Sequence, residues 1–332
     1  MKTLQSSSVL VTGGAGFIGS NLVEALLAQN NKVVCFDNFS TGKRENIEDF
    51  LDNPLFELIE GDIRDQEACH RACKDVKYVL HQAALGSVPR SINDPVTSTE
   101  VNIDGFVKML VAARDAGIKR FVYAASSSTY GDHPALPKSE DIIGKPLSPY
   151  AITKYVNELY AKVFADLYGI ETIGLRYFNV FGKRQDPDGA YAAVIPRFIK
   201  HLLAGNRPVI NGDGTQSRDF TYVENVVQIN QLALLTKNPV SINTIYNVAY
   251  GENTSLNELY GYLIEYLTPY MSTVNEIKPV YGPPRKGDVM HSLASIQKAV
   301  DLLDYKPLYS IKEGLKIAID WYVRNLRTTK TI

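Results

Sequence analysis

The feature that most constrains the fold of this chain is a glycine-rich loop near its N-terminus, at residues 12–19. A short apolar, β-branched run at residues 8–12 precedes it and predicts a buried parallel strand. Apolar residues recur with helical period after it. Strand, glycine loop and helix in this order are typical of a dinucleotide-binding βαβ unit, with the pyrophosphate at the helix N-terminus. The glycines provide a tight turn, a close approach to the pyrophosphate and close helix–strand packing, in the order Gly13, Gly16 and Gly19.

A second predicted strand, at residues 32–36, ends at Asp37, about 20 residues beyond the glycines. A carboxylate there accepts hydrogen bonds from ribose hydroxyls and repels a 2′-phosphate, so we expect NAD rather than NADP. The alternative, a glycine-rich turn that binds nothing, is disfavoured because strand, helix, second strand and acid are all in register. The residues expected to continue the cofactor pocket are Phe17, Ile18, Asn38, Ser40, Thr41 and Gly42.

Strand-like runs continue to alternate with helical patterns over the first half of the chain. This alternation predicts an α/β fold with a doubly wound parallel sheet of the Rossmann type. The runs lie at residues 56–60, 78–81, 120–125 and 172–177.

After about residue 180 the alternation ends, and Pro, Gly and Tyr become frequent. We therefore predict a smaller C-terminal lobe that binds the substrate, while a segment near residue 220 returns to the first domain. The predicted NAD-binding domain is residues 1–179 plus about 219–250, and the predicted substrate domain is about 180–218 plus 251–332.

Composition excludes several classes of protein. Of the 332 residues 21% are charged, the formal net charge is −1, and there is no long basic block, so no nucleic-acid or membrane partner is expected. No signal peptide or transmembrane run is visible. Three cysteines cannot form a disulfide framework, and we expect buried thiols rather than a metal site at Cys69 and Cys73. We expect a cytoplasmic protein without a bound metal.

Tyr150 and Lys154 are the predicted proton-transfer pair. Ser148 is a good N-cap and Pro149 fits the first helical position, so both side chains lie on one face of a helix reaching about Tyr168. A neighbouring ammonium and the helix dipole are expected to lower the pKa of Tyr150, making it a general base for a hydroxyl proton. The alternative is that Tyr150 and Lys154 are an ordinary pair of side chains on the surface of the helix.

Ser126 ends the predicted strand at residues 120–125, at the edge where doubly wound sheets bind ligands. Its hydroxyl can bridge a substrate oxygen and the phenolate. A capping or turn role is the alternative for any serine of the triplet Ser126, Ser127 and Ser128. Together with the glycine loop, these residues predict oxidation or reduction at an alcohol carbon.

At this point the chain resembles the extended short-chain dehydrogenase/reductase family almost from end to end. Residues 79–93, 123–134 and 174–196 especially resemble bacterial UDP-N-acetylglucosamine 4-epimerases of polysaccharide pathways. The motifs that carry the resemblance are the glycine loop, Gly61-Asp62-Ile63-Arg64-Asp65, His81-Gln82-Ala83-Ala84, Tyr130-Gly131, Tyr150/Lys154, Leu175-Arg176-Tyr177-Phe178-Asn179, Arg218-Asp219 and Arg285-Lys286-Gly287-Asp288.

The resemblance implies roles for further residues. Ser126 aligns with the catalytic hydroxyl, five residues before Gly131, and His81 is expected to be a packed strand-end residue. Implied cofactor contacts are Asp62 and Ile63 at the adenine, Gln82, Ala83 and Ala84 at the nicotinamide side, and also Asn102 and Phe178. Implied substrate contacts are Gly86, Ser87, Ser127, Asn179, Val194 and Ser292 at the sugar, Asn211 at the uridine, Arg218 and Arg285 at the diphosphate, and Asp288.

The resemblance implies reversible epimerisation at C4 of a UDP-hexose, through a 4-keto intermediate with hydride returned to the opposite face. Tightly bound NAD is then regenerated each cycle. Related 4,6-dehydratases carry an Asp-Glu pair where this chain has Ser127 and Ser128, which disfavours elimination. Ser292 replaces a bulky tyrosine of glucose-specific relatives, so UDP-GlcNAc and UDP-GalNAc are the expected sugars.

Other readings stay open from sequence. The substrate could be UDP-glucose/UDP-galactose or a UDP-uronic acid, and a non-catalytic nucleotide-binding regulator is a more remote reading. The resemblance also implies a homodimer formed through the helix that bears Tyr150 and its neighbour near residues 102–116.

Overall fold

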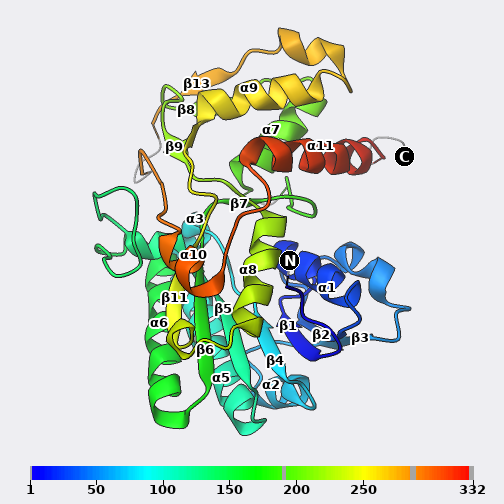
Figure 1. The fold of residues 1–332 in the computed structure, drawn as a ribbon. Coiled ribbons are helices and arrows are strands. Elements are labelled where there is room, and N and C mark those ends of the chain that lie inside the picture. Colours follow the sequence, from blue (N-terminus) through cyan, green and yellow to red (C-terminus); the bar gives the residue numbers. More distant parts are fainter. Residues whose placement is uncertain (1, 189–191, 285–288, 329–332) are drawn as a thin grey trace.

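A computed structural model describes residues 2–188, 192–284 and 289–328 of the chain. Its centre is a seven-stranded sheet in the order β11-β6-β5-β4-β1-β2-β3, in which every pair of neighbours is parallel (Figure 1). The strands are β1 (Ser8–Thr12), β2 (Lys32–Asp37), β3 (Phe56–Glu60), β4 (Tyr78–His81), β5 (Arg120–Ser126), β6 (Glu171–Tyr177) and β11 (Thr244–Val248). The predicted Rossmann-type sheet is confirmed, and its strands read as apolar runs because both faces are covered.

One hydrophobic cluster lies on each face of this sheet. The first joins the strands to α1 (Phe17–Leu27), α8 (Val223–Leu235) and α10 (Gln297–Leu303). The second joins them to α2 (Gln66–Cys73) and α5 (Gly105–Asp115), with α6 (Pro149–Tyr168) contributing Ala161 and Phe164. Two layers of helices therefore enclose the sheet.

A third cluster lies in the upper part of the molecule in Figure 1 and packs three helices together. These are α7 (Val194–Leu203), α9 (Leu256–Leu267) and α11 (Ile311–Thr328). Short strands pair beside them: β8 (Val209–Asn211) with β13 (Val280–Gly282), β9 (Ser217–Arg218) with β12 (Thr254–Ser255), and β7 (Val180–Phe181) with β10 (Thr221–Tyr222).

Residues from both halves of the chain contribute to the sheet layers. β11 and α8 pack there, and so do Ala299 and Leu303 of α10, far along the chain from the other strands. The division into a cofactor domain and a substrate domain stays a prediction, although α10 lies beyond residue 251 and packs on the sheet.

Two short helices and a π-helical turn lie between β4 and α5. They are α3 (Val88–Asn93), α4 (Pro95–Thr99) and the turn Glu100–Asp104, and all three pack against α6.

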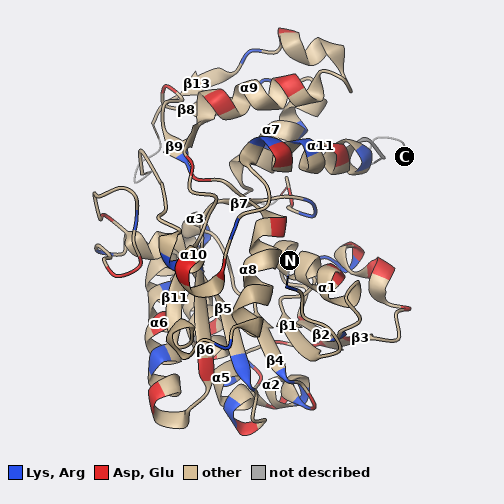
Figure 2. Cartoon of the chain, in the orientation of Figure 1, with Lys and Arg blue, Asp and Glu red and all other residues tan. Residues whose placement is uncertain are grey.

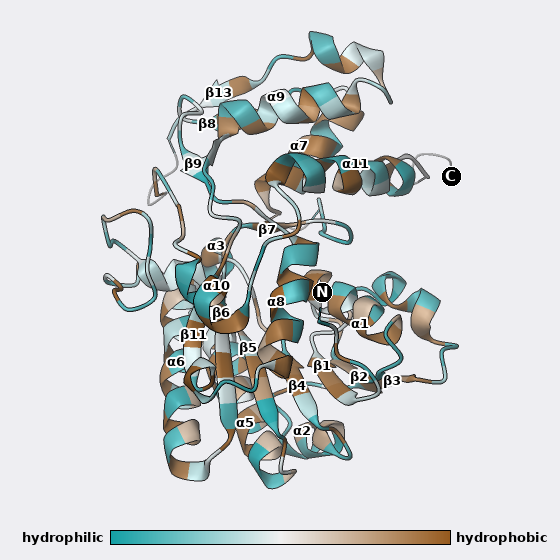
Figure 3. Ribbon diagram, viewed as in Figure 1, coloured by the Kyte–Doolittle hydropathy of each residue, from teal (hydrophilic) through white to brown (hydrophobic). Residues whose placement is uncertain are grey.

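Charge and hydropathy follow this architecture. Figure 2 shows acidic and basic residues interspersed over both parts of the molecule. Figure 3 shows hydrophobic residues along the central strands and also along α6. Within the described residues, every helix is too short or too polar to cross a membrane.

Candidate active site

A cavity of about 370 Å³ opens at the carboxyl ends of the central strands, where open α/β sheets bind ligands. It brings together most of the predicted cofactor residues, from the glycine loop to the catalytic serine and tyrosine. The site residues predicted from sequence that line this cavity are Gly13, Gly16, Phe17, Ile18, Gly19, Asp37, Asn38, Ser40, Thr41, Asp62, Ile63, Gln82, Ala83, Ala84, Gly86, Ser126, Tyr150, Lys154 and Asn179.

The glycine loop requires its glycines. Gly13 has a φ of +66°, and a Cβ there would lie 2.8 Å from the backbone nitrogen of Ala83. A Cβ on Gly19 would lie 2.0 Å from the carbonyl oxygen of Gly13. The loop is therefore compact enough to bring its backbone and the start of α1 against a bound pyrophosphate.

Asp37 lies beside this loop, at the end of β2, and is only 7% exposed. Its carboxylate accepts hydrogen bonds from the backbone N–H groups of Ala15 (2.9 Å) and Phe39 (2.8 Å). Burial raises the pKa of Asp37, and these hydrogen bonds oppose the rise. Among the described residues that line this cavity, the one cation is Lys154. A buried carboxylate that can accept hydrogen bonds from the ribose hydroxyls fits NAD.

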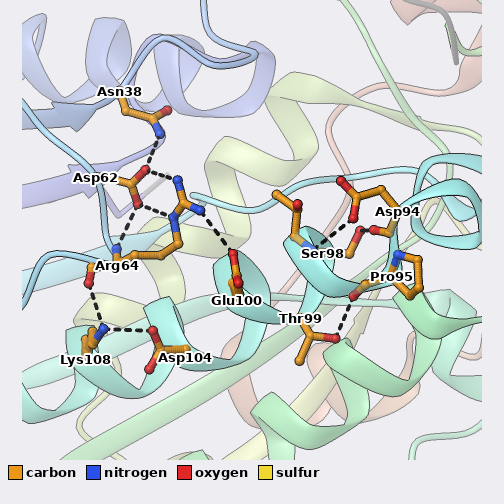
Figure 4. A network of polar contacts seen from close by, with 11 residues as sticks. Asn38, Asp62, Arg64, Asp94, Pro95, Ser98, Thr99, Glu100, Asp104 and Lys108 are labelled. Carbon is orange, nitrogen blue, oxygen red and sulfur yellow. Dashed lines mark hydrogen bonds and ion pairs between the residues drawn. The ribbon is translucent and has the colours of Figure 1, made fainter.

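The predicted adenine end is framed by a partly exposed polar network, which Figure 4 shows. Asp62 accepts hydrogen bonds from Asn38 (2.8 Å) and from Nε and Nη2 of Arg64 (3.0 and 2.8 Å). The Arg64 guanidinium lowers the pKa of Asp62 to about 2. Arg64 also reaches Glu100 (3.3 Å), and its carbonyl accepts from Lys108 (2.7 Å). The β3–α2 connection is thereby tied to the helices beside it.

The predicted catalytic end is built from buried groups. Lys154 is 3% exposed, and its ammonium donates to the carbonyl of Ala124 on β5 (2.9 Å). Ser126 accepts from both the hydroxyl (2.9 Å) and the backbone N–H (3.2 Å) of Ser128. The Ser126 side chain also acts on the Tyr150 phenol, whose pKa it lowers.

The titration behaviour of this end differs from the expectation. Burial raises the pKa of Tyr150, and the hydrogen bond with Ser126 lowers it by less. Burial also lowers the pKa of Lys154 to about 8. The prediction of a lowered Tyr150 pKa is therefore wrong for this structure, because desolvation outweighs the stabilisation of the phenolate.

The start of α6 is capped as predicted, with one addition. Ser148 accepts from the N–H of Ala151 (3.1 Å), and Pro149 occupies the first turn. The backbone N–H of Tyr150 donates to the hydroxyl of Ser91 on α3 (3.0 Å). The catalytic tyrosine is thus connected through its backbone to a helix outside the predicted site.

His81 is packed at the end of β4, as expected. It is 3% exposed, and burial lowers its pKa to about 3, so the ring is neutral. Its Nδ1 lies 2.9 Å from the hydroxyl of Thr12, which also accepts from the N–H of Ala83 (3.2 Å). This pair positions the loop after β4 and does not line the cavity.

A second cavity of about 230 Å³ adjoins the first, since Asn179 and Val180 line both. It brings together Asn179, Val194, Asn211 and Arg218 from the predicted substrate set. Arg218 donates to the carbonyls of Ser217 (2.8 Å) and Met290 (3.2 Å), beside the Ser292 segment. Arg285 and Asp288 lie outside the described residues.

Several predicted contacts lie outside the lining of both cavities. Gly42 backs onto Asp37, and a Cβ there would lie 2.9 Å from its carboxylate. Phe178 is fully buried against Tyr130. The others are Ser87, Asn102, Ser127 and Ser292. The binding roles of the site residues stay predictions.

The structure also adds contacts that sequence reasoning missed. Ser128 and Ser91 contact the catalytic serine and tyrosine directly. Tyr177 lines the cavity and donates to Gln82 (3.1 Å), while accepting from Asn230 (2.9 Å). The partners of Ser91 and Tyr177 lie far away in the sequence, so no local pattern identifies these contacts, whereas Ser128 lies two residues from Ser126.

Comparison with known proteins agrees with this geometry. The family model described as the NAD dependent epimerase/dehydratase family matches residues 9–249. A putative UDP-glucose 4-epimerase of Methanocaldococcus jannaschii is 41% identical, over 96% of this chain and 100% of that one.

Two solved structures are also similar over nearly the whole chain. The UDP-N-acetylglucosamine 4-epimerase from Methanobrevibacter ruminantium, in complex with UDP-N-acetylmuramic acid, is 39% identical with a TM-score of 0.88, covering 97% of this chain and 99% of that one. The UDP-glucose 4-epimerase of Thermotoga maritima, with UDP-glucose, is 37% identical with a TM-score of 0.87, covering 96% and 99%. On this evidence the chain belongs to the NAD dependent epimerase/dehydratase family.

Proposed function

We propose that the chain is a UDP-sugar 4-epimerase that interconverts UDP-GlcNAc and UDP-GalNAc. The observation that carries the reaction type is the group of Ser126, Tyr150 and Lys154 at one end of a dinucleotide cleft, next to a second cavity. The relatives named as UDP-sugar 4-epimerases support the same reaction.

The cofactor in this proposal is NAD. Bound NAD supplies the hydride acceptor and donor that epimerisation at C4 requires, and it leaves each cycle unchanged. The glycine loop would hold its pyrophosphate, Asp37 its adenosine ribose, and Asn38 and Asp62 its adenine. Tight retention of NAD belongs to the proposal as well.

Proton transfer falls to Tyr150 through Ser126. The Tyr150 phenolate accepts the 4-hydroxyl proton and returns it when the 4-keto sugar is reduced on its opposite face. Ser126 would relay this proton, because its hydroxyl can accept from the sugar and donate to Tyr150, and both residues line the first cavity. Lys154 lines the same cavity and is the cation that would favour the phenolate against the effect of burial. Arg218 would hold the diphosphate while the sugar turns.

A dehydratase is the alternative within the same family. Elimination needs an acid and a base next to the catalytic hydroxyl, but Ser127 and Ser128 stand there. In the described part of the cavity the lining carboxylates are Asp37 and Asp62, both at the adenosine end. This arrangement favours epimerisation.

The reaction is tested by anaerobic incubation with UDP-GlcNAc and no added cofactor, followed by chromatography. Wild type is expected to form UDP-GalNAc, and Tyr150→Phe to retain less than about 1% of the rate, since positioned proton transfer contributes about 10²–10⁴-fold. Tyr160→Phe is the matched control, because Tyr160 lies on the exposed side of the same helix. Copurifying NAD without conversion of any UDP-sugar would instead favour a nucleotide-binding regulator.

The acetamido preference rests on Ser292. Its backbone N–H donates to the carbonyl of Ser217 (3.1 Å), one residue from Arg218, so its small side chain stands near the proposed diphosphate site. Ser292→Tyr is expected to lower turnover of UDP-GlcNAc relative to UDP-glucose by about tenfold or more. An unchanged ratio, or faster wild-type turnover of UDP-glucose or UDP-glucuronic acid, would contradict the preference.

We also propose that the protein is a homodimer with one cofactor and one substrate domain in each subunit. α6 exposes a row of apolar side chains that a second copy could cover. They are Ile152, Leu159, Val163 and Leu167. Sedimentation equilibrium would report twice the chain mass of 36.9 kDa, and a monomer mass would contradict the proposal.

A further inference from the structure

The segment at residues 85–91 connects the cavity wall to the catalytic helix. Gly86 lines the first cavity, and Ser87 follows with a φ of +103°, a conformation that a serine rarely adopts. Such backbone strain persists only where the surrounding contacts hold the residue in place. Both ends of this segment have such contacts.

Asn102, on the π-helical turn, holds the first end. Its amide oxygen accepts from the N–H of Leu85 (2.8 Å), and its amide nitrogen donates to the carbonyl of Leu85 (3.1 Å). The same nitrogen donates to the hydroxyl of Thr153 (3.2 Å), which in turn donates to the carbonyl of Tyr150 (2.8 Å). Leu85 is therefore linked to the backbone of the catalytic tyrosine.

Ser91 holds the second end. Its side chain is fully buried, its hydroxyl donates to the carbonyl of Val88 (2.8 Å), and it accepts from the N–H of Tyr150 (3.0 Å). An N–H group in the first turn of a helix has no acceptor within that helix. Ser91 supplies the acceptor from another element, so the backbone of Tyr150 is bonded on both its N–H and its C=O side.

We propose that Ser91 is a positioning residue that sets the place of the Tyr150 phenol through the backbone N–H at the start of α6. Residues 85–91 then couple the position of Gly86, in the wall of the first cavity, to the position of the Tyr150 phenol. The kinetic part of this proposal rests on the proposed function, because that function makes Tyr150 the group that accepts the 4-hydroxyl proton.

Hydrogen exchange tests the link without any activity. Ser91→Ala removes the acceptor, so exchange of the Tyr150 amide, followed by NMR or by mass spectrometry of its peptide, should become at least about tenfold faster. Ser98→Ala is the matched control, because Ser98 is 1% exposed on α4 and its hydroxyl donates to the carbonyl of Asp94 (2.8 Å; Figure 4). Equal exchange in Ser91→Ala and Ser98→Ala would overturn the proposal.

Kinetics test the consequence. Ser91→Ala should lower kcat by about tenfold with little change in KM or bound NAD, because small displacements of a catalytic group are costly. Ser91→Thr, which keeps the hydroxyl, should recover most of the rate. The pH profile of kcat in Ser91→Ala should also shift, since the phenol has moved relative to Ser126.

A double-mutant comparison separates positioning from general damage. In a Tyr150→Phe background, Ser91→Ala should leave the residual rate unchanged, because its effect passes through the missing hydroxyl. A further tenfold loss there would overturn the positioning role. If wild type converts no UDP-sugar, the proposed function fails, while the exchange experiment still decides the link between Ser91 and Tyr150.

Discussion

The two ends of the cofactor cleft are built in opposite ways. At the adenosine end, Asp62, Arg64 and Glu100 are charged, paired and between 26% and 53% exposed at their side chains. At the catalytic end, Ser126 and Lys154 are at most 9% exposed, and Lys154 bonds to a backbone carbonyl rather than to a carboxylate.

The charges at the two ends should therefore contribute differently to stability. Exposed ion pairs contribute little because water screens them and their side chains lose entropy. A buried ammonium without a counter-charge is costly and shifts its own pKa, as Lys154 does. We therefore expect substitutions at the catalytic end to have large effects of either sign, and those at the adenosine end to have small ones.

The largest expected effect is on turnover at the catalytic end. Ser126→Ala removes the hydroxyl between substrate and Tyr150, and kcat should fall by about 10²–10³-fold. Steady-state rates with UDP-GlcNAc measure the loss, and Ser98→Ala controls for removal of a buried hydroxyl nearby. A loss below about threefold would show that Tyr150 acts on the substrate without Ser126.

The fold was largely predictable from sequence, since buried parallel strands appear as short apolar runs and Gly13 marks the first turn. Strands β1 to β6 lie within one residue of their predicted ranges. The paired two-residue strands and the packing of α10 on the sheet were not predictable, because tertiary contacts, not local pattern, create them.

The site was predictable where a motif gives both residue type and place. Tyr150, Lys154 and Asp37 line the cavity together for that reason. Ser91 was missed because its hydroxyl meets Tyr150 only through space, 59 residues away in sequence. The sign of the Tyr150 pKa shift was missed for a related reason: sequence shows the neighbouring lysine but not the depth of burial.

The next effect in size is on stability. Lys154→Met removes a buried charge, so the free energy of unfolding at pH 7 should rise by about 1–3 kcal/mol while activity is lost. Because the pKa of Lys154 is about 8 in the folded protein and 10.5 ordinarily, wild type recovers stability as the pH rises from 8 toward 10.5.

The advantage of Lys154→Met should therefore shrink over that pH range. Urea unfolding of the NAD-free proteins at pH 7 and pH 9.5 measures it, with Lys162→Met as an exposed control on the same helix. A variant that is less stable than wild type at pH 7 would show that the bond to Ala124 outweighs the cost of burial.

The smallest expected effect lies at the adenosine end. Arg64→Ala removes the two hydrogen bonds from Arg64 to the Asp62 carboxylate and the ion pair of Arg64 with Glu100. The side chains of all three residues are at least partly exposed. Stability should change by less than about 0.5 kcal/mol. NAD should dissociate only about two- to fivefold faster, since Asn38 still donates to Asp62. Fluorescence of released cofactor measures the rate, with Arg44→Ala as an exposed control paired to Glu60. Loss of NAD on purification of Arg64→Ala would mean that this exposed network, not the buried end, governs retention of the cofactor.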